Sequence, residues 1–274
     1  MTEEKNLMTD EMFQCVGIDE QSSETLVRPS ISYWQDAVRR LKKNKVAMIS
    51  LFFLIFMIFM CIFAPYIYPH AYNEQNIELV NQGPTKEHIF GLDDLGRDIF
   101  ARIWVGGRVS LAIGGVGALI SLVVGVIYGG ISGFCGGIVD DILMRILEIL
   151  CGIPYMVVVI VVSLYLGKGM TSLMLALCMT SWTGLARLVR GEILELKESE
   201  YVMAARVLGT PSFKIITRHL IPNTMSVIII NTTFMVPSFI FSEAFLSFIG
   251  MGVQPPMTSW GAMASLGQQQ IDRK

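Results

Sequence analysis

The sequence predicts an all-α integral membrane protein. Of its 274 residues, 53% are hydrophobic and 16% are charged, and its mean hydropathy is +0.55; soluble domains carry about 25% charged residues. Each of five long stretches has about the length that crosses the hydrocarbon as a helix, and a helix satisfies every backbone polar group where water is absent. We therefore expect five spans. The charge-free stretches are 46–69, 109–139, 149–167, 169–186 and 220–242.

Residues 1–45 are expected to form a cytoplasmic tail that ends in a helix on the membrane surface. The first 24 residues carry seven acidic residues and one lysine, a composition typical of disordered segments. Further on, Tyr33, Trp34, Ala37, Val38 and Leu41 recur at helical spacing, which predicts an interfacial helix with Trp34 at headgroup level. The apolar stretch 46–69 begins too late for a secretory signal, so we interpret it as the first span.

Basic residues predict the orientation of the spans. Because the positive-inside rule places the basic cluster before the first span in the cytoplasm, the segment 70–108 is expected outside. The loop 187–218, with six basic residues, is then again cytoplasmic. The cluster consists of Arg39, Arg40, Lys42, Lys43 and Lys45.

Small residues and prolines predict how the spans pack and bend. The stretch 109–139 is too long for one span, so its glycine-rich end is expected to form the turn that leaves the membrane. Pro154 and Pro237 each lack a backbone donor and are expected to kink their helices. Glycines at intervals of four allow close helix crossing in lipid. They are Gly125, Gly129, Gly133 and Gly137.

The outer segment 97–108 is amphipathic. Asp98 and Arg102 are four residues apart and can pair on a helix. We expect an interfacial helix at the outer mouth of the bundle, which either contacts an extracytoplasmic protein or only packs there. Its apolar face consists of Ile99, Phe100, Ile103 and Trp104.

Ionisable residues within spans are costly and usually face the protein interior. Arg145 and Glu148 lie three residues apart, so a local ion pair is expected. Glu243 lies about 20 residues beyond Pro222, which puts it near the outer end of its helix. It is expected either to line an outer vestibule on the translocation path or to reach interfacial water.

The cytoplasmic loop 195–222 predicts two short helices with a break between them. Residues 201–208 are good helix formers, and Gly209 suits the left-handed position that ends a helix. Thr210 can cap the next helix, with Pro211 in its first turn. Two adjacent alanines, Ala204 and Ala205, would let the surface of another protein approach closely. An ordinary connector between spans is the alternative.

These loop residues resemble the EAA loop of binding-protein-dependent ABC permeases. Ala204, Ala205 and Gly209 followed by Pro222 match the motif, whereas Met203 stands where the general motif has Glu. The segment 218–223 reads RHLIPN and is similar to the RHxLPN variant of the peptide and nickel subfamily.

Three further stretches support the same resemblance. Residues 90–98 (FGLDDLGRD) are similar to the FGTDxxGRD signature of the C-type subunit of oligopeptide and dipeptide permeases. Trp182 with residues 186–192 (ARLVRGE), and residues 243–256 with 259–261, also match the family. The resemblance covers residues 35–270 or so.

The resemblance implies a MetI-like type I importer permease bundle in the bacterial cell membrane, with residues 109–274 as its core. It implies a second, homologous permease subunit, two ABC ATPase subunits and an extracytoplasmic peptide-binding protein as partners. No cofactor, metal or nucleic acid is implied. The residues expected to couple to the ATPase are Glu200, Tyr201, Ala204, Ala205, Arg206, Gly209, His219 and Pro222.

The resemblance also implies six spans, one more than the sequence contains. A final helix is expected after Gln270, yet the sequence stops at Lys274. We therefore expect that the sixth span is missing and that the core is incomplete at its C-terminal end.

Other function classes fit the sequence less well. A secondary transporter usually shows repeats and polar residues at mid-membrane, and the sequence has no HExxH or GxSxG motif of an enzyme. Gly167-Lys168-Gly169 lacks the remaining residues of a P-loop, so ATP is expected to bind to a separate subunit. Nickel import is the nearest alternative substrate, but His70 and His88 are eighteen apart and are interpreted as surface residues. The five cysteines lack ligand spacing and are expected to pack.

Overall fold

The computed structural model describes residues 33–271, and the chain divides into two units between Leu54 and Ile55. In the first unit, α1 (Tyr33–Lys43) is the expected short amphipathic helix, with Arg40 Nε donating to Asp36 Oδ2 at 2.7 Å. The helix α2 (Lys45–Ile67) begins in this unit and matches the first predicted span. The acidic tail and the side chain of Trp34 lie outside the described residues.

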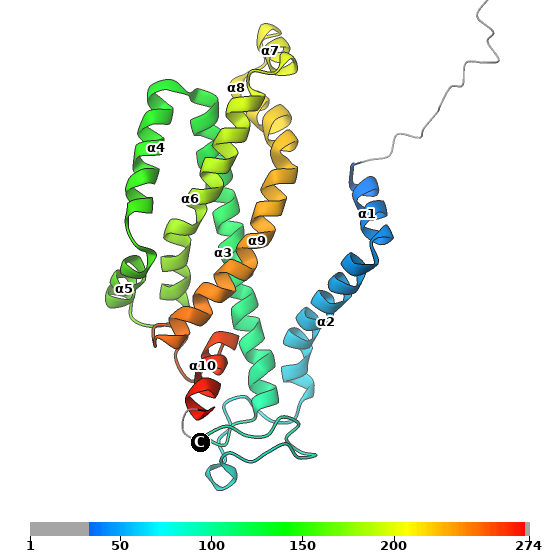
Figure 1. Ribbon diagram of the computed structural model, residues 1–274, viewed down its shortest axis with the longest axis vertical. Helices are drawn as coiled ribbons and strands as arrows, with labels where there is room; N and C mark the ends of the chain where they lie inside the picture. Colours follow the sequence, from blue (N-terminus) through cyan, green and yellow to red (C-terminus); the bar gives the residue numbers. More distant parts are fainter. Residues whose placement is uncertain (1–32, 272–274) are drawn as a thin grey trace, which may run out of the picture. The chain divides into compact units, whose positions relative to one another are not determined.

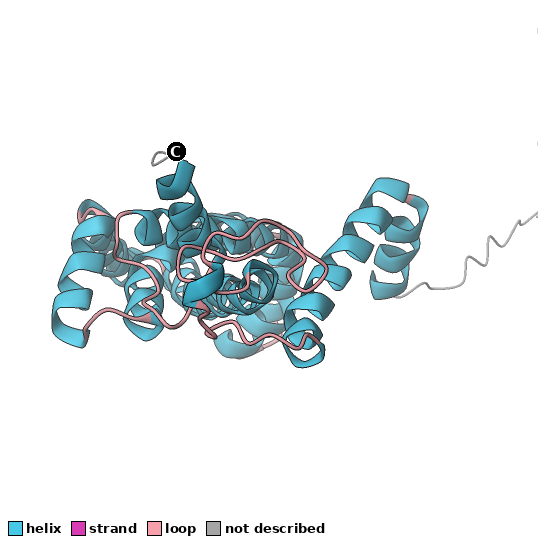
Figure 2. Ribbon diagram, turned by 90° about the horizontal axis from the view of Figure 1, so that it is seen from below, coloured by secondary structure: helices cyan, strands magenta, loops and turns pink. Residues whose placement is uncertain are grey.

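The second unit is a bundle built on three long helices. These are α3 (Ile99–Cys135), α6 (Met170–Leu196) and α9 (Ile221–Phe248), which run side by side (Figure 1). The short helices α7 (Glu200–Val207) and α8 (Ser212–Ile215) lie at one end of the bundle. At the other end lie α10 (Trp260–Ile271) and the irregular segment 68–98, which contains the short helix η2 (Ile77–Leu79) and crosses the helix ends (Figure 2).

Within residues 33–271, four helical segments are long and apolar enough to cross a membrane: 45–67, 99–135, 170–196 and 212–248. A fifth candidate is the pair α4 (Gly137–Gly152) and α5 (Tyr155–Leu166), which together pass the same test but meet at 81°. The predicted third span is thus broken rather than kinked. Pro154 stands at the break, where it lacks the N–H that would continue α4. Pro237, by contrast, lies inside the continuous helix α9.

The predicted separate helix at 97–108 is wrong. The helix α3 begins at Ile99 and continues without interruption to Cys135. Its 37 residues correspond to about 55 Å, well beyond the ~30 Å of hydrocarbon, so the helix extends out of the membrane. The irregular part of the predicted loop 70–108 ends at Asp98, whose carboxylate caps α3 by accepting from the N–H of Ala101 at 2.8 Å.

Glycines of α3 determine how closely α6 packs against it. A Cβ at Gly129 would collide with the carbonyl oxygen of Ala186, and one at Gly133 would lie 2.8 Å from the carbonyl oxygen of Arg190. Gly125 packs against Leu185 in the same way. The fourth glycine of the predicted series, Gly137, instead has open space around it and a φ of +53°, so it serves the turn into α4.

Gly129→Ala should therefore lower the free energy of unfolding by about 1–3 kcal/mol, because the added methyl group must separate two packed helices. The measurement is thermal unfolding of the purified protein in detergent. Gly115→Ala is the matched control, since Gly115 lies in α3 with nothing within 4 Å of its added Cβ. Equal melting temperatures for the two variants would contradict the role of Gly129.

Candidate coupling loop and buried polar clusters

The predicted two-helix loop is present, and Gly209 separates its helices. Gly209 adopts a φ of +74°, and its N–H donates to the carbonyl of Arg206 at 2.9 Å. The N–H of Thr210 donates to the carbonyl of Ala205 at 3.0 Å, which completes a Schellman motif. The prediction that Thr210 caps the second helix is wrong. Pro211 occupies that position, and no side chain makes a capping hydrogen bond there.

The two alanines of the loop face opposite directions. Ala204 is exposed, whereas Ala205 is 8% exposed and packs with Val202 and Ile215 against the bundle. The expectation that Ala205 offers its small surface to a partner is therefore wrong. Its small size instead lets α7 lie close to its own chain.

The exposed face of the loop is apolar. Val207 is 88% exposed, Leu208 84% and Phe213 75%, and Met203 beside them is 49% exposed. Single exposed apolar residues are ordinary, but a group of large ones marks an interaction surface. We call these four residues the loop tip. Sequence reasoning missed it because the residues adjoin Gly209, where the helical pattern is interrupted.

The remaining coupling residues fasten the loop to the bundle. Asn223 Nδ2 donates to the carbonyl of His219 at 2.6 Å and to the hydroxyl of Tyr201 at 3.3 Å. The guanidinium of Arg206 lies 5.3 Å from the ring centre of Phe134, at the end of α3. Glu200 occupies the first turn of α7, where its negative charge interacts favourably with the positive end of the helix dipole.

A π-helical segment connects the loop to the last long helix. It spans η3 (Ile216–Leu220) and continues directly into α9, with Pro222 in the first turn of that helix. Pro222 lacks an N–H, which the first turn of an ordinary helix does not need. The helix α8, this π-helical segment and α9 thus form one nearly continuous helical rod over residues 212–248.

A salt bridge that the sequence did not reveal joins α4 to α6 near the same end. The carboxylate of Asp140 accepts from Arg190 Nε at 2.6 Å and Nη2 at 2.5 Å, and Ser132 Oγ donates to it as well. Asp140 is 6% exposed. Its partner lies fifty residues away on another helix, so helical spacing offers no signal for the pair. The predicted pair of Arg145 and Glu148 is confirmed at 3.0 Å on the exposed side of α4.

Glu243 lies inside the protein, not at an outer vestibule or in interfacial water. It is 0% exposed, and its carboxylate accepts from the hydroxyls of Ser247 and Ser259, both at 2.6 Å, and of Ser110 at 3.4 Å. These serines come from α9, from the segment before α10 and from α3. Glu243 therefore connects three parts of the chain at the end of the bundle opposite the loop.

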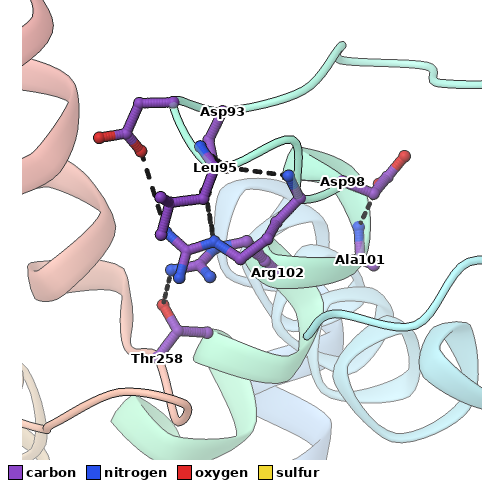
Figure 3. A network of polar contacts seen from close by, with 8 residues as sticks. Asp93, Leu95, Asp98, Ala101, Arg102 and Thr258 are labelled. Carbon is purple, nitrogen blue, oxygen red and sulfur yellow. Dashed lines mark hydrogen bonds and ion pairs between the residues drawn. The ribbon is translucent and has the colours of Figure 1, made fainter. Parts of the chain in front are cut away.

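The segment before α3 forms a second polar network (Figure 3). The carboxylate of Asp93 accepts from the N–H groups of Leu95 and Arg97, both at 2.9 Å, and from Arg97 Nε at 2.8 Å. Arg102 Nε lies 3.6 Å from the same carboxylate, and Arg102 Nη2 donates to Thr258 Oγ1 at 3.4 Å. The predicted pair of Asp98 and Arg102 is not formed.

The two histidines interpreted as surface residues are half-buried and lie together. Their ring centres are 4.5 Å apart, and His88 Nδ1 lies 2.8 Å from Asp98 Oδ2. Tyr68 donates to the same oxygen at 3.0 Å. Burial of the phenol and its hydrogen bond to Asp98 raise the pKa of Tyr68 above its ordinary value. Within residues 33–271, no three His, Cys, Asp or Glu side chains come together in a way that could hold a metal ion.

Two models of known protein families match the sequence of this chain. The family model described as "Binding-protein-dependent transport system inner membrane component" matches residues 122–270. A second, described as "N-terminal TM domain of oligopeptide transport permease C", matches residues 32–84.

Several curated proteins are similar over most of their length. The dipeptide transport system permease protein DppC of Bacillus subtilis (strain 168) is 46% identical over 265 residues, 97% of this chain and 83% of the relative. The oligopeptide transport system permease protein OppC of the same organism is 43% identical over 256 residues, 93% of this chain and 84% of the relative. The OppC protein of Escherichia coli (strain K12) is 40% identical over 255 residues, with 92% and 84% covered.

Replacement of Glu243 should destabilise the bundle. Glu243→Ala should cost about 3 kcal/mol of unfolding free energy, because it leaves a void and two buried hydroxyls without their acceptor. Glu243→Gln should cost less, since the amide oxygen still accepts. Thermal unfolding of the purified protein measures both. The control Glu148→Ala, at an exposed helical site, should stay within about 0.5 kcal/mol, and an equal loss there would contradict a special role for Glu243.

Proposed function

We infer that this chain, which belongs to the binding-protein-dependent transport system inner membrane component family, is the permease subunit of an ATP-driven importer of oligopeptides or dipeptides. The observation that carries the proposal is that its relatives named as dipeptide and oligopeptide permeases match more than nine-tenths of the chain at 40–46% identity. Nickel import is the alternative within the subfamily.

The loop tip supports a docking site for an ATPase subunit. Four large apolar side chains are exposed at one end of a multi-pass membrane protein, and an exposed apolar group on a short helix suits the groove of a partner. The chain has no P-loop of its own, so ATP hydrolysis belongs to separate subunits. We propose that Met203, Val207, Leu208 and Phe213 contact the ATPase, and that the eight residues predicted from the motif shape and fasten the loop.

The mechanism that we propose is alternating access. Closure of a pair of ATPase subunits would displace the loop tip. The π-helical segment and α9 would carry that displacement along the bundle, because they continue the loop without a flexible break. A second, homologous permease subunit would complete the pathway, and an extracytoplasmic binding protein would deliver the substrate. The basic residues before α2 favour a cytoplasmic N-terminus in a bacterial cell membrane.

The substrate can be tested by uptake in a strain that lacks this gene. Labelled di-, tri- and pentapeptides and nickel ions are offered to the deletion strain and to the strain complemented with this chain. Peptide uptake should disappear on deletion and return on complementation, while nickel uptake stays unchanged. Loss of nickel uptake alone would overturn the peptide assignment while leaving the permease fold intact.

The docking role of the loop can be separated from its folding. Leu208→Glu, at an 84% exposed site, should leave thermal stability within about 0.5 kcal/mol, yet abolish copurification with the ATPase subunits and peptide uptake. Ala205→Glu, at a buried site, should instead lower stability, because it buries an unpaired charge. A Leu208→Glu protein that still binds its ATPase and transports would contradict the docking site.

A further inference from the structure

We propose that a cavity at the end of the bundle opposite the loop binds the C-terminal carboxylate of the transported peptide. The inference rests on the proposed function and adds a specificity site within this subunit. The cavity has a volume of 530 Å³ and lies among the segment 73–97, the connection from α9 to α10, and α10 itself. Small-ligand sites fall in the same size range.

Two buried arginines of this cavity have unused donors. Arg97 is 6% exposed and Arg102 is 3% exposed, and both line the cavity. The terminal nitrogens of Arg97 have only the carboxylate of Asp94, 4.0 Å from Nη2, as a partner among the described residues. Arg102 Nη1 is buried without any hydrogen-bond partner in residues 33–271. Asp93 is the close anionic partner of Arg97 through Nε, so the donors without a close acceptor are the terminal nitrogens of Arg97 and Nη1 of Arg102.

The nearby acidic residues leave these guanidinium donors without a close acceptor. Asp93 is already engaged by two backbone N–H groups and by Arg97 Nε, which leaves Arg102 at the longer distance of 3.6 Å (Figure 3). Arg102 Nη2 reaches Thr258 only at 3.4 Å. A single incoming carboxylate could accept from both guanidinium groups, the arrangement in which Arg–carboxylate pairs are strongest.

The rest of the lining suits the end of a peptide. Four side-chain amides, which can donate to carbonyl groups and accept from peptide N–H groups, line the cavity beside the arginines. A cavity with amides of this kind fits an extended peptide end better than a flat protein surface does. The amides belong to Asn73, Gln75, Gln254 and Gln269.

The test compares a peptide with its C-terminally amidated analogue in the complete transporter, reconstituted in liposomes with its partner subunits and binding protein. The unmodified transporter should prefer the free acid. Arg97→Gln and Arg102→Gln should lower the acid-to-amide uptake ratio about tenfold, the effect of losing a charged hydrogen bond. Because every sample contains the same binding protein, its own selectivity cancels from the comparison.

A third variant tests the site without removing a buried arginine. Gln269→Glu leaves both arginines in place and adds a competing carboxylate to the cavity, so it should lower the same ratio. Arg145→Gln is the control, since Arg145 is an exposed cation of α4 that does not line the cavity, and it should leave the ratio unchanged.

An unchanged ratio in all three cavity variants would overturn the carboxylate site while peptide uptake continues. An equal fall in acid and amide uptake, with weaker capture of the binding protein, would also overturn it and assign the arginines to an acidic residue of that partner. Absence of any peptide uptake by the unmodified transporter would overturn the proposed function, and this site with it.

Discussion

The close approach of α3 and α6 is the constraint on which the rest of the bundle depends. Lipid is as apolar as a leucine side chain, so burial of apolar surface does not drive helices together within a membrane. Contact must come from packing, and Gly125, Gly129 and Gly133 remove the side chains that would keep α6 away. The backbones meet over this stretch, and the leucine, valine and isoleucine side chains of α6 interlock with the surface of α3.

Polar clusters at the two ends of the bundle hold together the helices that the glycine contacts bring close. At the loop end, Asp140 and Arg190 hold α4 to α6. At the other end, the carboxylate of Glu243 accepts hydrogen bonds from serines of three segments. The glycine contact adjoins the first cluster, because Gly129 and Gly133 pack against the backbone of Arg190. We therefore expect a displacement at the loop to move α3, α4 and α6 together, because the salt bridge and the glycine contacts join them.

Sequence reasoning predicted the fold class, the positions of the four long apolar helices and the two-helix loop, because each depends on a local pattern: charge-free length, helical spacing or a glycine that ends a helix. It failed where partners are distant in sequence. Asp140 with Arg190, and Glu243 with Ser110, join residues fifty or more positions apart. It also failed at Ala205, because a motif shows which residues recur without showing which side of the helix meets the bundle.

The orientation of Ala205 has a consequence for how the loop works. A docking helix that transmits force needs one face for its partner and another held by its own chain. Ala205 and Val202 provide the second face, while the loop tip provides the first. Gly209 turns the chain sharply, and the π-helical segment then leads straight into α9. Two backbone hydrogen bonds close this turn, and the proposed transmission of a push on the loop tip to α9 depends on the turn staying closed.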